Sequence, residues 1–339
     1  MRGAAHGRGG VSVSERLLQV RDLRVTYPGR AGWGRSGHAN PALAGVDLDV
    51  ESGGSVGIVG ESGCGKSTLA RAILGLVAPQ SGSIAWRGVP VPRGDGSALR
   101  RLRREAQIVF QDPFGSLDPR MTLADSVAEA LVALEGPTPR ARVVARVAAS
   151  LAEVGLDPSL ASRYPHEVSG GQCQRAAIAR ATIARPGLLV CDEAVSALDV
   201  SVQAQIVNLL ADLSRRHGMA LVFISHNLAV VRHLCDEVVV LYCGRVVERG
   251  PREAIFASPR HPYTRALLDA VPAPDPVVAR RSSAVPAALD ASVRPAPGGC
   301  DYRPRCPRAG PECAARIPAL ATTGTGHAVA CHHPLSTAG

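Results

Sequence analysis

The segment Gly60–Thr68 constrains the fold of this chain more than any other. It fits the pattern G-x-x-x-x-G-K-[ST]. An apolar run at 55–59 precedes it and predicts a strand, and residues 65–76 have the spacing of a helix. In such a strand–loop–helix unit, glycines let backbone N–H groups converge on phosphate oxygens at the helix N-terminus. The segment therefore predicts a phosphate-binding loop, the P-loop, formed by Gly60, Glu61, Ser62, Gly63, Cys64, Gly65, Lys66, Ser67 and Thr68.

The lysine of this loop is the only lysine in the chain. Lys and Arg together number 38, and all the others are Arg. An ammonium is compact and a guanidinium is planar, so the two differ in size and donor geometry. We expect Lys66 to reach the β and γ phosphates of a nucleotide, and Ser67 to offer its hydroxyl to Mg²⁺. A chance Gly-rich turn would account for the glycines but not for the lysine.

Two acidic residues end an apolar run farther along the chain. Residues 188–191 predict a buried strand, and Asp192 and Glu193 follow it. We expect Asp192 to bind Mg²⁺ beside the P-loop and Glu193 to act as general base for an attacking water. His226 follows the next apolar run, and we expect it to contact the γ phosphate and to hold the water and Glu193. A lone His after a strand is usually structural, but this spacing favours function.

A Ser-Gly-Gly-Gln segment precedes another predicted helix. Ser169 stands at the helix start and would be a good N-cap in any protein. A cap alone does not need the two glycines and the glutamine that follow. Close approach of the backbone to a second phosphate group would need them, so we expect Ser169, Gly170, Gly171 and Gln172 to contact a nucleotide.

Strands and helices alternate along much of the chain. This alternation predicts an α/β fold with a mostly parallel sheet that is covered on both faces. Between residues 112 and 175 the pattern is mainly helical, which predicts an inserted helical subdomain. No run of about 18 apolar residues free of charge occurs, so we expect no membrane-spanning helix.

Residues 17–250 resemble the ABC ATPases, because their motifs occur in the order of that family: Tyr27, the P-loop, Gln111, the Ser169 segment, Asp192 and Glu193, Asp199 and His226. The resemblance implies a P-loop ABC ATPase domain with a RecA-like core, an antiparallel β subdomain and a helical subdomain. It implies ATP and Mg²⁺ at the site, and a dimer in which the Ser169 segment faces ATP bound by the partner. It also implies that Tyr27 stacks on adenine and that Gln111 senses Mg²⁺ and relays to the helical subdomain. Asp199 is implied to belong to the nucleotide site.

Three further segments look like the oligopeptide/dipeptide importers of that family: 111–120, 164–167 and 261–268. Residues 172–175 are similar to the F-type ATPase of these importers, which is paired with a D-type ATPase. Val168 departs from the Phe or Leu that is usual before the signature Ser. The resemblance implies a motor that energises uptake of di- and oligopeptides. Its implied partners are a second ATPase subunit, two membrane permease subunits and, indirectly, a solute-binding protein.

The composition changes near both ends of the chain. Residues 1–15 predict a disordered tail, and 16–256 predict the ATPase domain. Residues 257–339 predict an oligopeptide-transporter-type C-terminal region. Within that region, 271–297 is rich in Pro and Ala and predicts a linker, and 298–335 is a Cys-rich tail.

Four cysteines lie in that tail: Cys300, Cys306, Cys313 and Cys331. Four thiolates suit either tetrahedral Zn²⁺ or an iron–sulfur cluster. The short C-x₂-C pairs that are common in structural zinc sites are missing, which argues against zinc; zinc and no metal remain as alternatives to a cluster. The family resemblance implies a [4Fe–4S] site with a structural or regulatory role.

Other functions remain as alternatives. The related motors import nickel, glutathione or another small solute, and the ATPase itself does not touch the solute. A soluble ABC ATPase that acts on nucleic acid or in iron–sulfur maintenance is an alternative of another class. The net charge of +9 could suit nucleic acid, but the Arg residues are scattered and aromatic residues are only 3%. We therefore expect no nucleic-acid partner, and a peripheral protein on the cytoplasmic face of the cell membrane.

Overall fold

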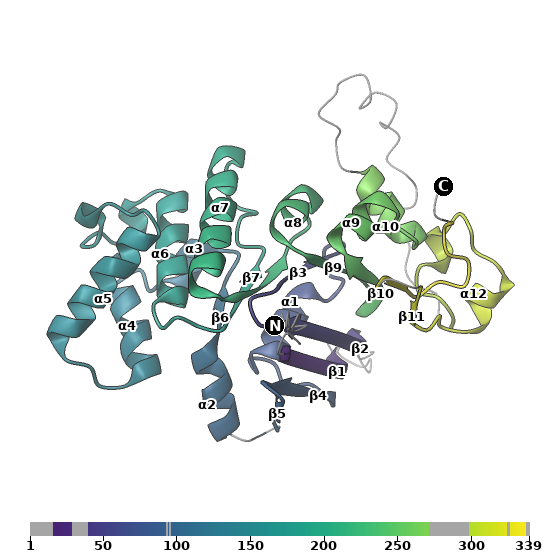
Figure 1. Ribbon diagram of the computed structural model, residues 1–339, viewed down its shortest axis with the longest axis horizontal. Helices are drawn as coiled ribbons and strands as arrows, with labels where there is room; N and C mark the ends of the chain where they lie inside the picture. Colours follow the sequence, from purple (N-terminus) through teal and green to yellow (C-terminus); the bar gives the residue numbers. More distant parts are fainter. Residues whose placement is uncertain are drawn as a thin grey trace, which may run out of the picture.

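The computed structural model describes residues 16–28, 40–92, 94, 96–270, 298–323 and 326–336. The predicted N-terminal tail at 1–15 and the predicted linker at 271–297 lie outside these residues. Figure 1 shows an elongated molecule with a helical group at one end and the C-terminal segment at the other, on either side of two sheets.

The first sheet has four strands in the order β2-β1-β4-β5. Neighbouring strands in this sheet are antiparallel, and Val20 of β1 lies opposite both Leu48 of β2 and Ile84 of β4. Alternate β1 side chains such as Leu18 and Val20 are buried, which gives this sheet one apolar face. The strands are β1 (Arg16–Tyr27), β2 (Asn40–Glu51), β4 (Ser81–Trp86) and β5 (Val89–Pro90). The implied antiparallel β subdomain is therefore present.

The second sheet has eight strands in the order β11-β12-β10-β9-β3-β8-β7-β6. The five strands from β9 to β6 in that order run parallel, and every residue of β7 and of β8 is buried. Full burial requires cover on both faces of the sheet. The five are β3 (Ser55–Val59), β6 (Ala106–Val109), β7 (Leu188–Asp192), β8 (Ala220–Ile224) and β9 (Glu237–Tyr242). The predicted parallel sheet is confirmed, although three antiparallel strands extend one edge.

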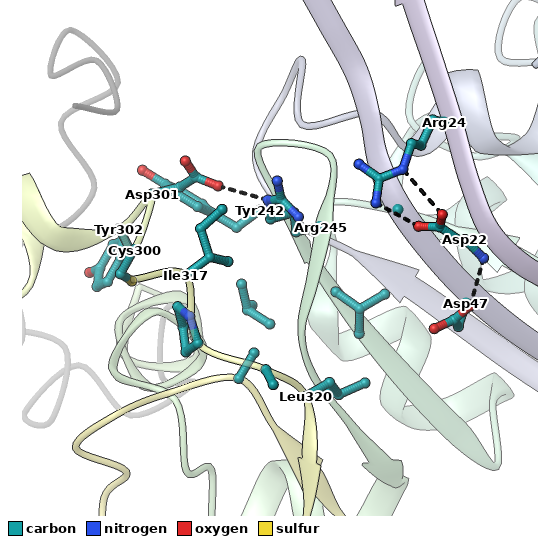
Figure 2. Close-up of a pocket in the computed structure, with 16 residues that line it drawn as sticks. Asp22, Arg24, Asp47, Tyr242, Arg245, Cys300, Asp301, Tyr302, Ile317 and Leu320 are labelled. Carbon is teal, nitrogen blue, oxygen red and sulfur yellow. Dashed lines mark hydrogen bonds and ion pairs between the residues drawn. The ribbon is translucent and has the colours of Figure 1, made fainter. Parts of the chain in front are cut away.

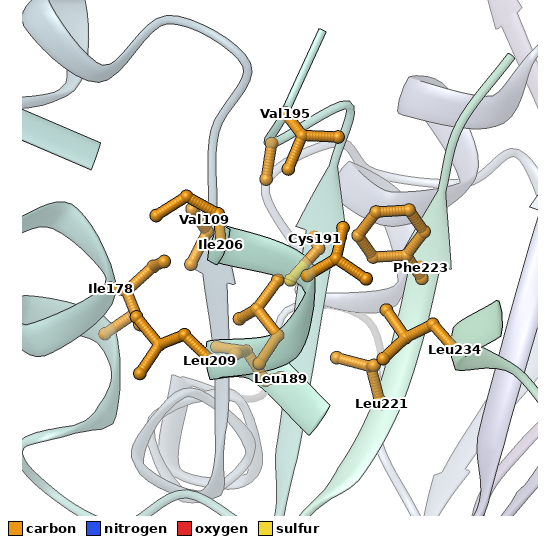
Figure 3. Packing of buried hydrophobic residues seen from close by; sticks show 14 of the residues in the cluster. Val109, Ile178, Leu189, Cys191, Val195, Ile206, Leu209, Leu221, Phe223 and Leu234 are labelled. Atoms are coloured by element: carbon orange, nitrogen blue, oxygen red, sulfur yellow. The ribbon is translucent and has the colours of Figure 1, made fainter. Parts of the chain in front are cut away.

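Two apolar cores lie on the two faces of this sheet. One face packs Leu189 and Phe223 against Ile178 and Ile206 of the helices (Figure 3). These helices are α6 (Gly170–Thr182) and α7 (Val200–His217). On the other face, Val190 belongs to a core that also holds Leu18 of the first sheet and Leu69 of α1 (Lys66–Ile73). Helix α1 is therefore packed between the two sheets, which fixes the P-loop in front of it.

The segment after residue 112 is mainly helical, as predicted. It contains α3 (Pro113–Ser116), α4 (Leu123–Glu135), α5 (Arg140–Glu153) and the beginning of α6. Helix α6 packs against both α4 and α5 and continues to Thr182, so the helical segment runs past the predicted boundary at 175. Helix α2 (Gly96–Glu105) has no counterpart among the predicted elements, and it carries the one dense run of Arg residues in the chain, at 100–104.

The C-terminal region adds to the core sheet. Its strands β11 (Ala321–Thr322) and β12 (Ala328–Val329) extend the sheet beyond β10 (Arg245–Pro251). Its helical elements are α10 (Pro262–Asp269), the 3₁₀ turn η4 (Arg303–Arg305) and α12 (Pro311–Ala315). Helices α8 (Leu228–Leu234) and α9 (Arg252–Ala257) precede this region, and the 3₁₀ turns η1 (Pro158–Leu160) and η2 (Pro165–Glu167) belong to the helical segment between α5 and α6. Among the described residues, no helix has the length and apolar character needed to cross a membrane.

Candidate active site

The P-loop joins the end of β3 to the start of α1. Two of its glycines are required by the close approach of other strands. A Cβ at Gly60, where φ is +154°, would lie 2.2 Å from the carbonyl oxygen of Leu241 in β9. A Cβ at Gly65, where φ is +111°, would lie 2.4 Å from the carbonyl oxygen of Ala42 in β2. The loop is thus held between two strands at a spacing that only glycine allows.

The side chain of Lys66 is buried over this loop. Lys66 is only 4% exposed, and its Nζ donates hydrogen bonds to the carbonyl oxygens of Gly60 (2.8 Å) and Glu61 (2.9 Å). Nζ also lies 3.9 Å from Oε1 of Glu193. The one lysine ammonium of the sequence therefore lies where the P-loop and the acid that follows β7 meet.

Ser67 and Asp192 bring together the two predicted oxygen ligands of Mg²⁺. The Ser67 hydroxyl donates a 2.7 Å hydrogen bond to Oδ1 of Asp192. Burial raises the pKa of Asp192, and the bond from Ser67 acts in the opposite direction. Mg²⁺ prefers oxygen ligands and keeps several of its waters, so a hydroxyl beside a carboxylate suits this ion.

Glu193 has an unusual backbone conformation. Its φ is +50°, which is uncommon for a residue with a side chain. The conformation is held by hydrogen bonds, because the Glu193 N–H donates to the carbonyl of Ile224 (3.0 Å) and its carbonyl accepts from Ser196. The turn directs the carboxylate toward His226, whose Nδ1 lies 3.5 Å from Oε2. Strain of this kind concentrates at functional sites.

Tyr27 lies beside the first turn of α1. It ends β1, and its hydroxyl is 3.5 Å from Oγ1 of Thr68. The residue is 39% exposed, which leaves part of the ring open to a stacking partner. Gln111 is exposed two residues after the end of β6 (Ala106–Val109), and Asp199 is exposed at the N-cap position of α7.

Ser169 caps α6. Its Oγ accepts a hydrogen bond from the Gln172 N–H (3.3 Å), and its own N–H donates to Oε1 of Gln172 (2.9 Å). This reciprocal pair confirms the N-cap interpretation. A Cβ at Gly171 would lie 2.7 Å from Cγ1 of Val202, so packing against α7 also requires one of the glycines. Within the described part of the chain, the hydrogen bonds of Ser169 stay within its own helix start and do not reach the P-loop.

Two P-loop contacts come from the C-terminal region and were not predicted. The Glu61 N–H donates a 2.8 Å hydrogen bond to the hydroxyl of Tyr263 in α10. The Glu61 carboxylate accepts two hydrogen bonds from the guanidinium of Arg305, of 2.6 and 2.9 Å. Tyr263 lies in a segment that the sequence had marked as family-like, but the only sign of Arg305 was its place before Cys306.

The tail is attached to the core at several places. Strand β12 pairs with β10, with Val329 opposite Glu248. Glu248 is fully buried and accepts hydrogen bonds from the backbone N–H groups of Arg260 and His261, while His327 Nε2 lies 2.6 Å from its Oε1. The backbone and ring nitrogens thus satisfy a carboxylate that would be costly to bury unpaired.

A cleft of about 450 Å³ lies between the tail and the strands. Figure 2 shows Arg245 of β10 paired with Asp301 on one side of this cleft, at 3.3 Å, and Asp22 with Arg24 of β1 on the other. Cys300 also lines it. The cleft contains no P-loop residue, so it is distinct from the nucleotide site.

The four tail cysteines lie near one another. The Cys300 N–H donates a 2.8 Å hydrogen bond to the carbonyl of Cys313. Burial raises the pKa of the Cys331 thiol to about 11, and the charges of Cys306, Cys300 and Cys313 add to this rise. Within the residues that the structure describes, however, no three His, Cys, Asp or Glu side chains are arranged to hold a metal ion.

The fold and this site define an ABC-type ATPase, and sequence comparison agrees. The family described as "ABC transporter" matches residues 43–196. The family described as "Oligopeptide/dipeptide transporter, C-terminal region" matches residues 247–313.

The relatives define the family more narrowly. The "Oligopeptide transport ATP-binding protein OppF" of Salmonella typhimurium is 47% identical over 320 residues, which covers 93% of this chain and 95% of that protein. This chain therefore belongs to the family of ABC transporter ATP-binding proteins that includes this relative.

Solved structures show the same fold. CbiO1 of Clostridium perfringens, described as part of the ABC transporter complex CbiONQ, matches with a TM-score of 0.63 and 29% identity, over 72% of this chain and 92% of that one. The cassette MJ0796, solved as a dimer in a post-hydrolysis state with ADP and Pi, matches with a TM-score of 0.62 and 28% identity, over 70% of this chain and 99% of that one.

Proposed function

We propose that this chain is the ATP-hydrolysing motor subunit of an importer that takes up di- and oligopeptides. The observation that carries the proposal is the 47% identity to an oligopeptide transport ATP-binding protein over 93% of the chain. The match includes the C-terminal region, which a general ABC ATPase would not need. The alternatives, a nickel or glutathione importer and a soluble ATPase in nucleic-acid or iron–sulfur maintenance, have no comparable support.

Each residue of the site has its own role in the binding and hydrolysis of ATP. Lys66 and the P-loop N–H groups bind the phosphates, and Tyr27 stacks on the adenine. Ser67, Asp192 and Gln111 would hold Mg²⁺, which would supply positive charge to the β and γ phosphates. Glu193 accepts a proton from the attacking water.

His226 and Asp199 complete this site. The 3.5 Å approach of His226 to Glu193 supports a role in holding the base and the water. The Ser169–Gln172 segment acts on ATP held by a second ATPase subunit, and the exposure of Ser169 supports this. ATP binding closes the dimer, and hydrolysis opens it again.

The domain organisation fits this cycle. Residues 16–256 form the ATPase domain and 257–339 the C-terminal region. The helical subdomain at about 112–175 contacts two membrane permease subunits on the cytoplasmic face of the membrane. The second ATPase is a D-type subunit, and a solute-binding protein delivers the peptide.

The four tail thiols hold a [4Fe–4S] cluster in this proposal. Their mutual effect on pKa supports their proximity, with burial as the larger cause. Four thiolates also suit a single Zn²⁺, and no three such side chains among the described residues are arranged to hold a metal ion. The cluster in this proposal therefore rests on the family resemblance of the Cys-rich region.

Anaerobic purification with iron and zinc analysis tests the cluster separately from the motor. About four irons per chain, with broad absorbance near 400 nm, are expected for a [4Fe–4S] centre. One zinc or no metal would remove the cluster and leave the ATPase assignment intact.

Uptake in the source organism tests the motor function. Deletion of the gene should abolish uptake of labelled di- and oligopeptides and leave uptake of nickel and glutathione unchanged. The parental gene should restore uptake, and a Glu193→Gln variant should not. Loss of nickel or glutathione uptake instead of peptide uptake would assign a different solute.

A further inference from the structure

Glu61 connects the P-loop to the C-terminal region through both its backbone and its side chain. Its N–H donates to the Tyr263 hydroxyl, and its carboxylate accepts two bonds from Arg305. Its carbonyl accepts a bond from Nζ of Lys66. The residue next to the first P-loop glycine is therefore fixed on one side by the C-terminal region and bonded on the other to the phosphate-binding lysine.

The Arg305–Glu61 pair is shielded from water. The Arg305 side chain is 3% exposed and that of Glu61 is 23% exposed. Two parallel N–H···O bonds from one guanidinium fix the orientation of a carboxylate as well as its position. A pair this enclosed is screened little by salt, so its geometry is held firmly.

An aromatic cluster holds Arg305 in place. The rings of Tyr242, Tyr263 and Tyr302 lie with centroids 4.6 to 5.4 Å apart. The Arg305 guanidinium lies 5.7 Å from the ring centres of both Tyr242 and Tyr302, and Nη1 is 3.3 Å from the Tyr242 hydroxyl. The cluster combines β9, α10 and the tail, so Arg305 cannot move without disturbing all three.

Arg305 lies within the cysteine-containing turn of the tail. Arg305 ends η4 and directly precedes Cys306, and the N–H of Cys306 bonds back to the carbonyl of Arg303. The Cys300 N–H bonds to the carbonyl of Cys313 in the same segment. A change at the thiols that reshapes this turn would therefore move the guanidinium that holds the P-loop.

We propose that Arg305 is a positioning residue that sets the conformation of the P-loop through Glu61, so that the folded state of the Cys-rich tail controls the affinity for MgATP. The inference rests on the proposed nucleotide site at residues 60–68. It does not require any particular group at the cysteines.

Binding of a fluorescent ATP analogue to the full-length protein tests the proposal. Arg305→Met keeps the unbranched stem of the side chain and removes the paired donors. It should raise the Kd for the Mg²⁺ complex of the analogue about tenfold, as expected for loss of a strong charge-assisted contact. Arg308→Met removes an exposed charge from the same tail and should leave Kd unchanged. Arg305→Lys keeps the charge but lacks the planar guanidinium, so its Kd should lie between those of the parent and Arg305→Met.

A double-mutant cycle shows whether the effect passes through Glu61. Glu61→Ala should raise Kd by a similar factor, and the double variant should be no worse than either single one. In Arg305→Met, turnover at saturating ATP should change much less than Kd, because Arg305 lies outside the P-loop and the catalytic groups are untouched. Hydrogen exchange without nucleotide should quicken at residues 60–68 in Arg305→Met and stay the same in α6.

Three results would overturn the inference. One is a folded Arg305→Met protein with parental Kd and parental exchange at 60–68. Another is a double variant in which the two factors multiply. If Arg305→Met does not fold, the Kd values of Arg305→Lys and Glu61→Ala serve as the test in its place. A parental Kd in both of these variants would refute the positioning role of Arg305. Failure of the parental protein to bind the analogue would instead refute the nucleotide site.

Discussion

The hydroxyl of Ser67 donates a 2.7 Å hydrogen bond to the carboxylate of Asp192. The first residue lies at the start of α1 and the second at the end of β7. The bond joins the P-loop helix to the central sheet at the place where Mg²⁺ needs oxygen ligands. Glu193 follows Asp192 directly, so the same strand end supplies both the proposed metal ligand and the proposed base.

Replacing the proposed base should separate binding from hydrolysis. Glu193→Gln keeps the size of the side chain but cannot accept a proton, so ATP turnover should fall by at least about 100-fold. MgATP should still bind, and the closed dimer should accumulate. Phosphate release and size-exclusion chromatography with ATP measure the two effects. Hydrolysis at the parental rate would show that another group is the base.

The single lysine should not tolerate arginine. Lys66→Arg keeps the charge, but the buried site beside the carbonyls of Gly60 and Glu61 fits a compact ammonium. Turnover should fall by about 100-fold, comparable to the loss of an important electrostatic contact. Arg100→Lys, at an exposed position in α2, is the control for the reverse exchange and should be neutral. Equal activity of parent and Lys66→Arg would refute a size requirement.

Gly60→Ala should destabilise the fold as well as the site. The added Cβ would lie 2.2 Å from the backbone oxygen of Leu241, and neither group can move aside cheaply. We expect a loss of about 3 kcal/mol in the free energy of unfolding, typical of overpacking. Gly96→Ala, at the start of α2, meets nothing closer than 3.4 Å and should be neutral or stabilising. Thermal unfolding without nucleotide compares them, and matching stabilities would contradict the steric argument.

His261 should make the protein sensitive to acid. It is 1% exposed, and burial lowers its pKa to about 3 from the usual 6.5. Between these values the unfolded chain binds a proton that the folded chain does not, so stability falls as the pH falls. From pH 7 to pH 5 this amounts to at most about 2 kcal/mol.

A variant of this residue isolates the effect from other acid-sensitive groups. His261 Nδ1 accepts a 3.0 Å hydrogen bond from the Tyr263 N–H at the start of α10. Asn is also a good N-cap and does not titrate, so His261→Asn should lose less stability between the two pH values. Urea unfolding of both proteins at pH 7 and pH 5 measures this. Equal losses would show that the buried His is not responsible.

Several parts of the fold and site could be predicted from the sequence. Residues of β3 and β7 are short apolar runs that end at the P-loop and at Asp192, and α1 follows the loop directly. In a parallel sheet the carboxyl ends of neighbouring strands lie on one edge. Local pattern and this rule were enough to place Lys66, Asp192 and Glu193 together.

Other elements gave no such signal. Strands β11 and β12 have two residues each, too few to show a period of two. Helix α2 carries the Arg run 100–104, in which Arg103 donates a 2.8 Å hydrogen bond to the carbonyl of Gly75 beyond α1. Such a charge run has the composition of a solvated surface, and only the contact shows that it packs.

By itself, the sequence determined the identity of the P-loop, the acids after β7 and the helical insertion, because each depends on residues that are close along the chain. Only the tertiary structure decided that the tail lies on the core and that Arg305 reaches Glu61. The contacts that hold the tail, to Glu61 and to buried Glu248, join residues far apart along the chain. They form when the sheet order and the aromatic cluster bring those residues together, so no short-range pattern in the sequence predicts them.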